Sequence, residues 1–381
     1  MRLIPPGNTI GMLGGGQLGR MFTFKAKQMG YNVLVFDPAP NSPAGQAADA
    51  QIVANFDDEP ALHQLAEKCE VITYEFENVD VRAVEWLESW GQKVFPDSRA
   101  LKIAQNRWIE KEFLRGCGIG VADFCKVTNR AELEVAARQV GFPGLLKTTT
   151  GGYDGKGQIV LKDDAAAFRA FKRLNQPHLI WEKKVAFSKE LSVICARNFK
   201  GEVTTYPATE NIHVENILDV SIAPADVPAS VQTEAKRIAT TIAEHLNLIG
   251  VCGVEMFLLR DETILVNEIA PRPHNSGHYS LDACSCSQFE QHVRAICGLP
   301  LGSTDLKAYA VMVNILGTGA GNYLAGLEEA LRNHDVCFHL YGKKEAAAKR
   351  KMGHLTALSQ HSVQEALQVA LEARAKLKWI K

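Results

Sequence analysis

Two acidic residues interrupt apolar segments in the second half of the chain, and their spacing predicts a cation site. Val254–Leu259 and Ile264–Ile269 are rich in β-forming apolar residues, and the polar residues between them are typical of a tight hairpin. A two-residue turn at Asp261-Glu262 would place Glu255 opposite Glu268 on one face. Facing carboxylates repel each other and are costly to bury, so a hard cation such as Mg²⁺ is expected between them. The alternative is an exposed strand face that carries two unrelated acids.

The residues around the second acid favour an anionic ligand. Asn267 adds a neutral oxygen beside Glu268. The segment that follows supplies hydrogen-bond donors and positive charge: Arg272, His274, Asn275, Ser276 and His278. A cation site beside such donors is suited to a phosphate or carboxylate group.

The composition excludes several classes of protein. The 381 residues suit two or three domains, and a hydrophobic fraction of 46% is enough for buried cores. A net charge of −1 gives no basic surface for nucleic acid, and neither a signal-peptide pattern nor an apolar run of about 18 residues predicts a membrane. Nine scattered cysteines without CxxC or zinc spacing predict reduced thiols in the cytoplasm.

The first forty residues have the pattern of a nucleotide-binding βαβ unit. A strand over Thr9–Leu13 leads into the turn Gly14–Gly19, a helix over Gln17–Met29 and a strand over Asn32–Phe36 that ends at Asp37. The literal G-x-G-x-x-G motif is typical of dinucleotide binding. Its physical content is narrower, because such a turn offers backbone N–H groups to any phosphate. We favour another phosphate ligand over NAD(P), or over glycines that serve packing alone.

A Rossmann-like domain is predicted to end near Pro96. Its strand Val71–Tyr74 is followed by Glu75, Glu77 and Asn78. Ligands gather at the C-termini of strands in open α/β sheets, so Glu75 and Asn78 are expected to face the same cleft as Gln17. Ordinary surface acids are the alternative.

A small lid domain is predicted after a connecting helix, Ser98–Gly116, which carries Arg107. Residues 124–183 alternate short strands with two helices. Between the middle strands lies a loop rich in glycine and hydroxyl groups, bracketed by Lys147 and Lys156. Glycines let backbone N–H groups approach phosphate oxygens, which favours a phosphate ligand over a long ordinary hairpin.

The rest of the chain predicts a larger sheet with helices. Glu210–His213 is expected to form a polar cluster after a strand, and a lone His213 would more often be structural. Lys343, Lys344, Lys349 and Arg350 form a basic run between the last strand, Val336–Tyr341, and the last helix, Val363–Leu377. A solvated tail is the usual interpretation of such a run.

Taken in order, these parts resemble a known superfamily. The motifs are GMLGGGQLGRM, YEFEN, GGYDGKGQ, NEIAPRPHNSGH, SQFEQHVRA and YGK…RKMGH. They resemble the ATP-grasp superfamily of carboxylate–amine ligases and, within it, the family of 5-(carboxyamino)imidazole ribonucleotide synthases of purine biosynthesis. The resemblance implies an α/β (α+β) ATP-grasp fold. The expected parts are a Rossmann-like pre-ATP-grasp domain (1–97), a connecting helix (98–123), a lid (124–186), a main domain with the metal and ATP site (187–310) and a C-terminal subdomain (311–381).

The resemblance also implies roles for matching residues. Those expected to bind ATP are Arg107, Lys147, Gly152, Tyr153, Asp154, Gly155, Lys156, Gly157, Gln158, Glu182, Lys183, Lys184, Val185, Glu190, His213, Asn267 and Glu268. Those expected to bind the ribonucleotide and bicarbonate are Gln17, Leu18, Glu75, Tyr153, Asp154, Arg272, His274, Asn275, Ser276, Lys343 and Arg350. Glu255 and Glu268 would bind Mg²⁺. Lys147 and Arg272 would offset charge in the transfer, and Asp154 or His274 are candidates for a general base.

The implied reaction consumes ATP, bicarbonate and 5-aminoimidazole ribonucleotide, and passes through carboxyphosphate. No nicotinamide, flavin or zinc is expected, and the family predicts a homodimer in the cytoplasm. Three alternatives remain open. One is a relative with another acceptor, such as a formate-dependent glycinamide ribonucleotide transformylase or a biotin carboxylase. The others are an NAD-dependent oxidoreductase and a nucleotide sensor without turnover.

Overall fold

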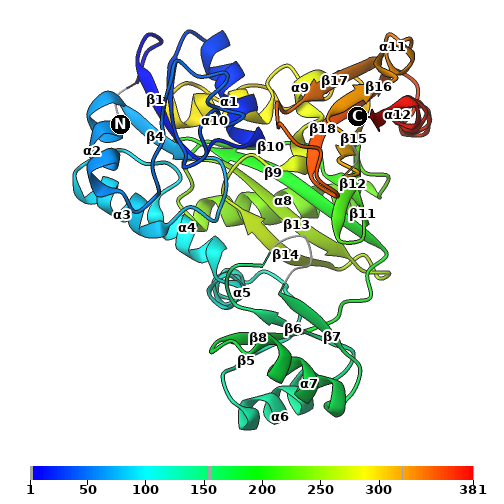
Figure 1. Cartoon of the computed structure of the whole chain (residues 1–381). Coiled ribbons are helices and arrows are strands. Elements are labelled where there is room, and N and C mark those ends of the chain that lie inside the picture. Colours follow the sequence, from blue (N-terminus) through cyan, green and yellow to red (C-terminus); the bar gives the residue numbers. More distant parts are fainter. Residues whose placement is uncertain (1–2, 153–156, 320, 381) are drawn as a thin grey trace.

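Three β-sheets and a two-stranded ribbon organise the chain in the computed structural model, which describes residues 3–152, 157–319 and 321–380. A parallel sheet lies at the N-terminal end, a large antiparallel sheet in the centre, and a small sheet with two helices forms a lid on the other side (Figure 1). Within these residues, none of the helices combines the length and the apolar character that a membrane span requires.

The N-terminal sheet has the predicted βαβ start. Its strands are parallel in the order β3 (Ala50–Ile52), β2 (Asn32–Phe36), β1 (Thr9–Leu13) and β4 (Val71–Tyr74), and its helices are α1 (Gln17–Gln28), α2 (Glu59–Lys68) and α3 (Val81–Ser89). The strands are nearly continuous apolar runs because helices cover both faces. One covering helix comes from far along the chain, since Phe289 and Val293 of α10 (Gln288–Cys297) pack with Met12 and Phe22.

The predicted connecting helix is two helices, so the expectation of one continuous helix over Ser98–Gly116 is wrong. α4 (Ser98–Gln105) ends at Asn106, and α5 (Arg107–Gly116) starts there. Asn106 has extended backbone angles, and its side chain accepts hydrogen bonds from the backbone N–H groups of Trp108 and Ile109. An asparagine favours such an N-cap because its oxygen satisfies donors that the first helical turn leaves unpaired.

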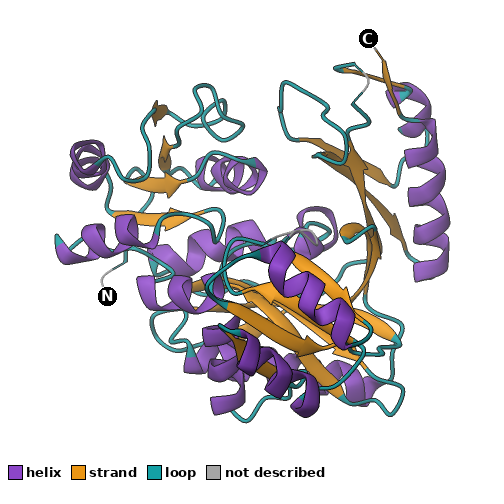
Figure 2. Ribbon diagram, turned by 60° about the horizontal axis from the view of Figure 1, so that its bottom comes forward, coloured by secondary structure: helices purple, strands orange, loops and turns teal. Residues whose placement is uncertain are grey.

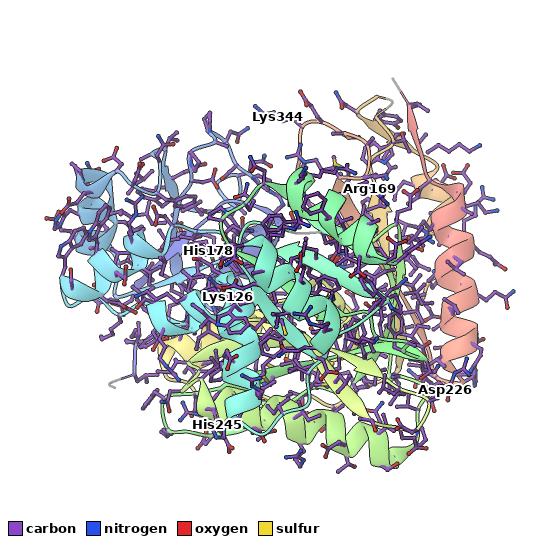
Figure 3. All side chains as sticks on the ribbon, turned by 90° about the horizontal axis from the view of Figure 1, so that it is seen from below. Lys126, Arg169, His178, Asp226, His245 and Lys344 are labelled. Atoms are coloured by element: carbon purple, nitrogen blue, oxygen red, sulfur yellow. The ribbon has the colours of Figure 1, made fainter. Side chains whose placement is uncertain are left out.

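The lid is a four-stranded antiparallel sheet covered by two helices. Its strand order is β5 (Phe124–Val127), β8 (Leu179–Lys183), β6 (Gly144–Thr148) and β7 (Gln158–Leu161), with α6 (Arg130–Gln139) and α7 (Asp164–Leu174) packed on one core. Seen from below, Lys126, Arg169 and His178 of this domain lie in front of the central sheet (Figure 3). The glycine-rich loop therefore joins β6 to β7, as predicted, although its residues 153–156 lie outside the described residues.

The central sheet runs without interruption from the hairpin with the paired acids to the C-terminal segment. Its order is β14 (Ile264–Ala270), β13 (Gly250–Leu258), β9 (Lys189–Arg197), β11 (Thr209–Val214), β12 (Ile217–Ala223), β15 (Tyr309–Leu316), β18 (Lys351–Ser359) and β17 (Val336–Leu340), and β10 (Val203–Thr205) also pairs with β9. α8 (Ala229–His245) buries its apolar face against β9 and β13. The sheet continues across residue 310, where the boundary between the main domain and the C-terminal subdomain was expected. The limits of these domains stay a prediction.

Two expectations about this sheet are wrong. Glu210–His213 lies within strand β11 rather than in a cluster after a strand. The basic run is followed by β18, a strand that sequence patterning missed, which is buried along most of its length between β15 and β17. β18 contains Gly353, His354 and Thr356, so its sequence lacks the apolar run that would predict a buried strand with neighbours on both sides. α12 (Val363–Lys376) lies against β15 and β18 at this end (Figure 2).

The remaining elements are short. They are η1 (Asn275–Gly277), α9 (Ser280–Ala283), α11 (Leu327–Ala330) and the ribbon of β16 (Tyr323–Ala325) with β19 (Lys378–Ile380). η1 and α9 follow the acid hairpin directly, so they hold the segment that was predicted to bind an anion.

We predict that Asn106→Ala lowers the free energy of unfolding by about 1 kcal/mol, because two N–H groups of α5 lose their acceptor. Urea denaturation measures the change. Asn129→Ala is the matched comparison, since Asn129 caps α6 in the same way and should cost a similar amount. Loss in the second variant alone would mean that the cap does not hold the break between α4 and α5.

Candidate active site

Glu255 and Glu268 face each other across the β13–β14 hairpin, as the sequence predicts. The turn differs from the expected one. Leu258 pairs with Ile264, and a β-bulge then makes Asn267 an extra residue, so that Met256 pairs with Val266 but Glu255 pairs with Glu268. The alignment of the acids therefore depends on the bulge and not on a two-residue turn, because a one-residue shift moves a side chain to the opposite face.

The electrostatics of this pair fit a hard cation. Burial, and then the negative charge of Glu268, raise the pKa of Glu255 to about 7. The donor set consists of two carboxylates and the neighbouring Asn267, which are oxygen ligands of the kind that Mg²⁺ binds. A divalent cation between the acids would remove the repulsion that raises this pKa.

His274 lies beside this acid pair in a defined orientation. Its Nε2 is 3.3 Å from Oε1 of Glu255, while its Nδ1 is 2.9 Å from the hydroxyl of Ser276 and accepts from the Ser276 N–H. An Nδ1 acceptor leaves the proton on Nε2, directed at the carboxylate. Burial, and then the charge of Arg272, hold the pKa of His274 well below its usual value, so the ring is neutral.

A buried network of hydroxyl and amide groups supports His274 from below. The Ser192 hydroxyl donates to Ser276 Oγ at 2.7 Å and accepts from Asn211 Nδ2 at 2.9 Å, and Ser276 is fully buried. Asn275 is paired with Asn314 through both amide groups, at 2.8 and 3.2 Å. In this conformation, Asn275 and Ser276 hold the segment in place, and their predicted contact with substrate remains untested.

Arg272 connects the hairpin to the N-terminal sheet. Its guanidinium donates to the carboxylate of Glu77, which follows β4, and to the carbonyl oxygen of Pro273 at 3.0 Å. Burial alone would raise the pKa of Glu77, but the charge and hydrogen bond of Arg272 hold this pKa below its ordinary value. Glu77 was not among the predicted site residues, and its place at a strand C-terminus was the signal that could have found it.

The glycine-rich turn after β1 does not present the free donors that the sequence predicts. Gly15 N donates to Asp37 Oδ2 at 2.7 Å, Gly19 N donates to Glu75 Oε2 at 2.8 Å, and Gly16 N donates to the other oxygen of Glu75. Gly14 has a φ of +97°, and an added Cβ would lie 2.6 Å from Glu75 Cγ. The expectation that these amides bind a phosphate is therefore wrong for Gly15, Gly16 and Gly19.

The basic run approaches this same turn, which contradicts a solvated tail for Lys343. Gln46 donates to the carbonyl oxygen of Gly342 at 3.0 Å, and Lys343 Nζ donates to that of Lys351 at 2.7 Å. Burial, and then the positive charge of Arg350, lower the pKa of Lys343 to about 8, while Glu75 opposes the shift. Lys343 is half-buried and Arg350 is exposed. Together they form one positive region, with Lys343 on its inner side and Arg350 on its outer side.

The predicted ATP residues gather where the lid meets the central sheet. Lys147 Nζ donates to Glu182 Oε2 at 2.9 Å, and Arg107 donates to the carbonyl oxygens of Thr148 at 3.0 Å and Gly152 at 2.6 Å. Although burial alone would raise it, the ammonium groups of Lys111 and Lys147 hold the pKa of Glu182 below its ordinary value. The other Glu182 oxygen is buried and has no donor among the residues that the structure describes.

A second predicted pair lies on the face of β9 and β11. His213 Nδ1 is 2.6 Å from Oε2 of Glu190. Although burial alone would lower it, the Glu190 hydrogen bond and the charge of Glu255 raise the pKa of His213. Of the other predicted residues, Gly157 and Gln158 flank the lid loop, and Lys183, Lys184 and Val185 lie at the end of β8 or just after it. Tyr153, Asp154, Gly155 and Lys156 lie outside the described residues.

Sequence reasoning missed several residues beneath the site. Ser192 lies two residues after Glu190 on β9, and Asn211 lies two residues before His213 on β11. Residues two apart on a strand share a face, and this spacing could have identified them. Glu110 and Lys111 of α5 are also buried here, only 3% and 2% exposed. Nothing in their spacing distinguishes them from the solvated face of a helix.

Asp282, His339 and His354 form a separate cluster near α9. His339 Nε2 is 3.0 Å from Asp282 Oδ2, and the two imidazole rings stack with centroids 4.5 Å apart and planes at 16°. His339 and His354 are cross-strand neighbours of β17 and β18. Parallel stacked rings do not direct their nitrogens at a common point, so we interpret the contact between Asp282 and His339 as a hydrogen bond that ties α9 to β17.

Comparison with known proteins agrees with this arrangement. Residues 7–105 match the ribonucleotide synthetase preATP-grasp domain, residues 112–289 the ATP-grasp domain, and residues 310–368 the phosphoribosylaminoimidazole carboxylase C-terminal domain. The N5-carboxyaminoimidazole ribonucleotide synthase of Bacillus subtilis (strain 168) is 48% identical over 359 residues, which cover 94% of this chain and 93% of that protein.

Solved structures give the same result. A crystal structure of an N5-carboxyaminoimidazole ribonucleotide synthetase in complex with ADP has a TM-score of 0.91 and 47% identity, and covers 98% of this chain and 97% of that one. The N5-carboxyaminoimidazole synthase of Aspergillus clavatus, in complex with ADP and the aminoimidazole ribonucleotide, has a TM-score of 0.88 and 35% identity, and covers 97% and 99%.

Fold and site together define a ligase of the ATP-grasp superfamily, with its preATP-grasp and C-terminal domains. The α/β ATP-grasp fold predicted from the sequence is confirmed. Within that superfamily, the chain belongs to the N5-carboxyaminoimidazole ribonucleotide synthases.

We predict that Glu268→Gln abolishes Mg²⁺-dependent ATP turnover and leaves the fold intact, because the cation loses one of its two carboxylates. ADP formation and circular dichroism measure the two effects. Glu262→Gln is the control, since it removes one charge from the turn of the same hairpin and should retain activity. Near-normal turnover of Glu268→Gln would remove the metal assignment.

Proposed function

We propose that the protein joins bicarbonate to the exocyclic amine of 5-aminoimidazole ribonucleotide at the expense of ATP, in purine biosynthesis. The observation that carries this proposal is the pair Glu255 and Glu268, which face each other across the β13–β14 hairpin between the lid residues and the residues from the N- and C-terminal ends. Structures of relatives contain ADP, and one contains ADP with the aminoimidazole ribonucleotide, which supports a nucleotide and this ribonucleotide as ligands.

On the lid side, we assign ATP to the junction of β6, β8 and α5. Lys147 and Arg107 would neutralise phosphate oxygens, and bound phosphates would compete with Glu182 and with the loop carbonyls for these cations. The buried Glu182 oxygen that lacks a donor is available to a donor of the nucleotide. Glu190, held by His213, is placed to accept from the ribose hydroxyls.

On the other side, we assign the ribonucleotide to the space between the glycine turn, Arg272 and the basic run. The 5′-phosphate would bind Lys343 and Arg350, which are the two cations of the positive region. The turn itself takes no part in phosphate binding through Gly16 and Gly19, because Glu75 occupies these amides. Arg272 and His274, between the two substrates, would orient bicarbonate.

The reaction that fits this placement has two steps. A bicarbonate oxygen attacks the γ-phosphorus of ATP, the bond to the ADP oxygen breaks, and carboxyphosphate forms. The exocyclic amine then attacks the carboxyl carbon, loses a proton and releases phosphate. When bound by Glu255 and Glu268, Mg²⁺ would neutralise charge on the β- and γ-phosphate oxygens. Such transfers need positioned charge more than covalent help, which agrees with a site rich in Lys, Arg and acids.

The lid would protect the intermediate from water. Its loop joins β6 to β7 beside Lys147, so closure of the lid over the phosphates would exclude solvent from carboxyphosphate. We also propose a homodimer in the cytoplasm. The family resemblance supports the dimer, and nine cysteines that form no disulfide among the described residues agree with a reducing compartment.

The proposal is tested by ADP release measured with ATP and bicarbonate, with and without 5-aminoimidazole ribonucleotide. Release should require the ribonucleotide for full rate and should accompany one carboxylated product for each ADP. Glycinamide ribonucleotide with formate, and biotin, serve as competing acceptors. Full turnover with either of them, and none with the aminoimidazole, would overturn the proposal.

We predict that the KM for the ribonucleotide rises as the pH increases through about 8, because Lys343 then loses its proton and its charge for the phosphate. The lowered pKa means that the ammonium is present below this pH and is lost above it. In Lys343→Arg the guanidinium stays charged, so the rise should disappear. Initial rates between pH 7 and 9, about either side of that pKa, measure the difference.

We predict that Arg350→Ala raises the KM for the ribonucleotide at every pH in that range and leaves the KM for ATP unchanged. The variant removes one of the two positive charges offered to the phosphate, and it should also move the pH-dependent rise of KM to higher pH, because the charge of Arg350 lowers the pKa of Lys343. An equal increase in both KM values would place Arg350 outside the ribonucleotide site.

A further inference from the structure

Glu110 and Lys111 are buried neighbours in α5 that hold strand β14 on both sides of Glu268. The Lys111 ammonium donates to the carbonyl oxygens of Asn267 at 2.8 Å and Val266 at 3.3 Å. The Glu110 carboxylate accepts from the backbone N–H of Ile269 at 2.6 Å. Both residues therefore bind the backbone that flanks Glu268 without touching its carboxylate.

These bonds fall at the β-bulge, where the ladder between β13 and β14 is interrupted. Asn267 is the extra residue between the pairs Met256–Val266 and Glu255–Glu268. β14 is the edge strand of the sheet, and Lys111 supplies a donor for the carbonyl groups of Val266 and Asn267 where the bulge falls. If the bulge were lost, β14 would shift by one residue and Glu268 would turn away from Glu255.

The ammonium of Lys111 also reaches the lid. It lies 3.9 Å from Oε2 of Glu182, the oxygen that accepts from Lys147 at 2.9 Å. One buried cation thus contacts the strand that carries Glu268 and the acid that orients Lys147. The helix that provides it starts with Arg107, which donates to the carbonyl oxygen of Gly152, so α5 contacts both the lid and β14.

Packing alone does not account for a lysine at this position. A buried ammonium is costly unless it is paired and hydrogen-bonded, and a methionine would fill a similar volume without that cost. The three partners of Lys111 are two carbonyl groups of the bulge and one carboxylate. What the charge provides is a fixed position for the bulge.

We propose that Glu110 and Lys111 are positioning residues that maintain the bulge at Asn267 and so keep Glu268 opposite Glu255 for the cation–nucleotide complex. This inference rests on the metal role assigned to these acids under the proposed function. It predicts a selective effect, since the clamp acts on the carboxylate that faces the cation and leaves the ribonucleotide residues in place.

The test measures two affinities of the full-length protein: that for ADP in the presence of Mn²⁺, and that for ADP in EDTA. Mn²⁺ serves as a spectroscopic substitute for Mg²⁺. Electron paramagnetic resonance follows the bound Mn²⁺, and calorimetry follows ADP and the ribonucleotide. Lys111→Met and Glu110→Met should each weaken the binding of Mn²⁺ with ADP about tenfold or more, as loss of an outer partner of a metal ligand does. In Glu110→Met, which removes no partner of Glu182, binding of ADP in EDTA and of the ribonucleotide should stay near the wild-type value.

Two further variants make the result specific. Glu110→Gln keeps an oxygen that accepts from Ile269 N, so it should retain most of the Mn²⁺ affinity that Glu110→Met loses. Arg197→Met is the matched control, because Arg197 is a cation of the same sheet that donates to a backbone carbonyl, that of Leu248 at 3.1 Å, far along β9 from the acids. It should bind Mn²⁺ and both ligands like the wild type.

The proposal is overturned if the two methionine variants bind Mn²⁺ with ADP normally, or if they lose affinity for all three ligands to the same extent. If Lys111→Met does not fold, the two Glu110 variants decide, and equal Mn²⁺ affinity of both would reject the clamp. A wild-type protein that binds Mn²⁺ with ADP but forms no carboxylated ribonucleotide would instead contradict the proposed function and leave the clamp standing.

Discussion

The repulsion between two carboxylates that face each other across a hairpin is the constraint on which the rest of this structure depends. Glu255 and Glu268 lie on neighbouring strands, and their mutual charge together with burial raises the pKa of Glu255 to about 7. Around them the protein places neutral or cationic groups: the neutral ring of His274, Arg272 and the His213 ring. The site is thus organised for a ligand that brings positive charge between the acids and negative charge beside them.

Local patterns in the sequence predicted the βαβ start, the lid and the acid hairpin, whereas most of the site residues were chosen from the family resemblance and stay a prediction. Two apolar β-forming segments separated by a polar break located the hairpin, and the two acids inside them were conspicuous. The glycine-rich loop between Lys147 and Lys156 fell between the predicted strands, where the structure has β6 and β7. The family resemblance then gave an ATP-grasp fold, which the comparisons confirm.

What the sequence could not give is what depends on partners far along the chain. The correct alignment of Glu255 and Glu268 was predicted from a turn that does not exist, and a bulge produces it instead. Glu110 and Lys111 of α5 carry no local signal of burial, because the contacts that bury them come from residues more than 150 positions away. β18 was missed because His354 and Thr356 belong to a polar interior that only neighbouring strands create.

The carboxylate of Glu75 in the glycine turn has a consequence for selectivity among cellular metabolites. In many βαβ folds this turn recognises the pyrophosphate of NAD or FAD, and here an internal acid satisfies the same amides. A dinucleotide would have to displace a buried side chain and approach its negative charge, so these abundant redox carriers are poor competitors. The glycine motif therefore has a structural role here, and the Glu75 carboxylate takes the position of the anion at its amides.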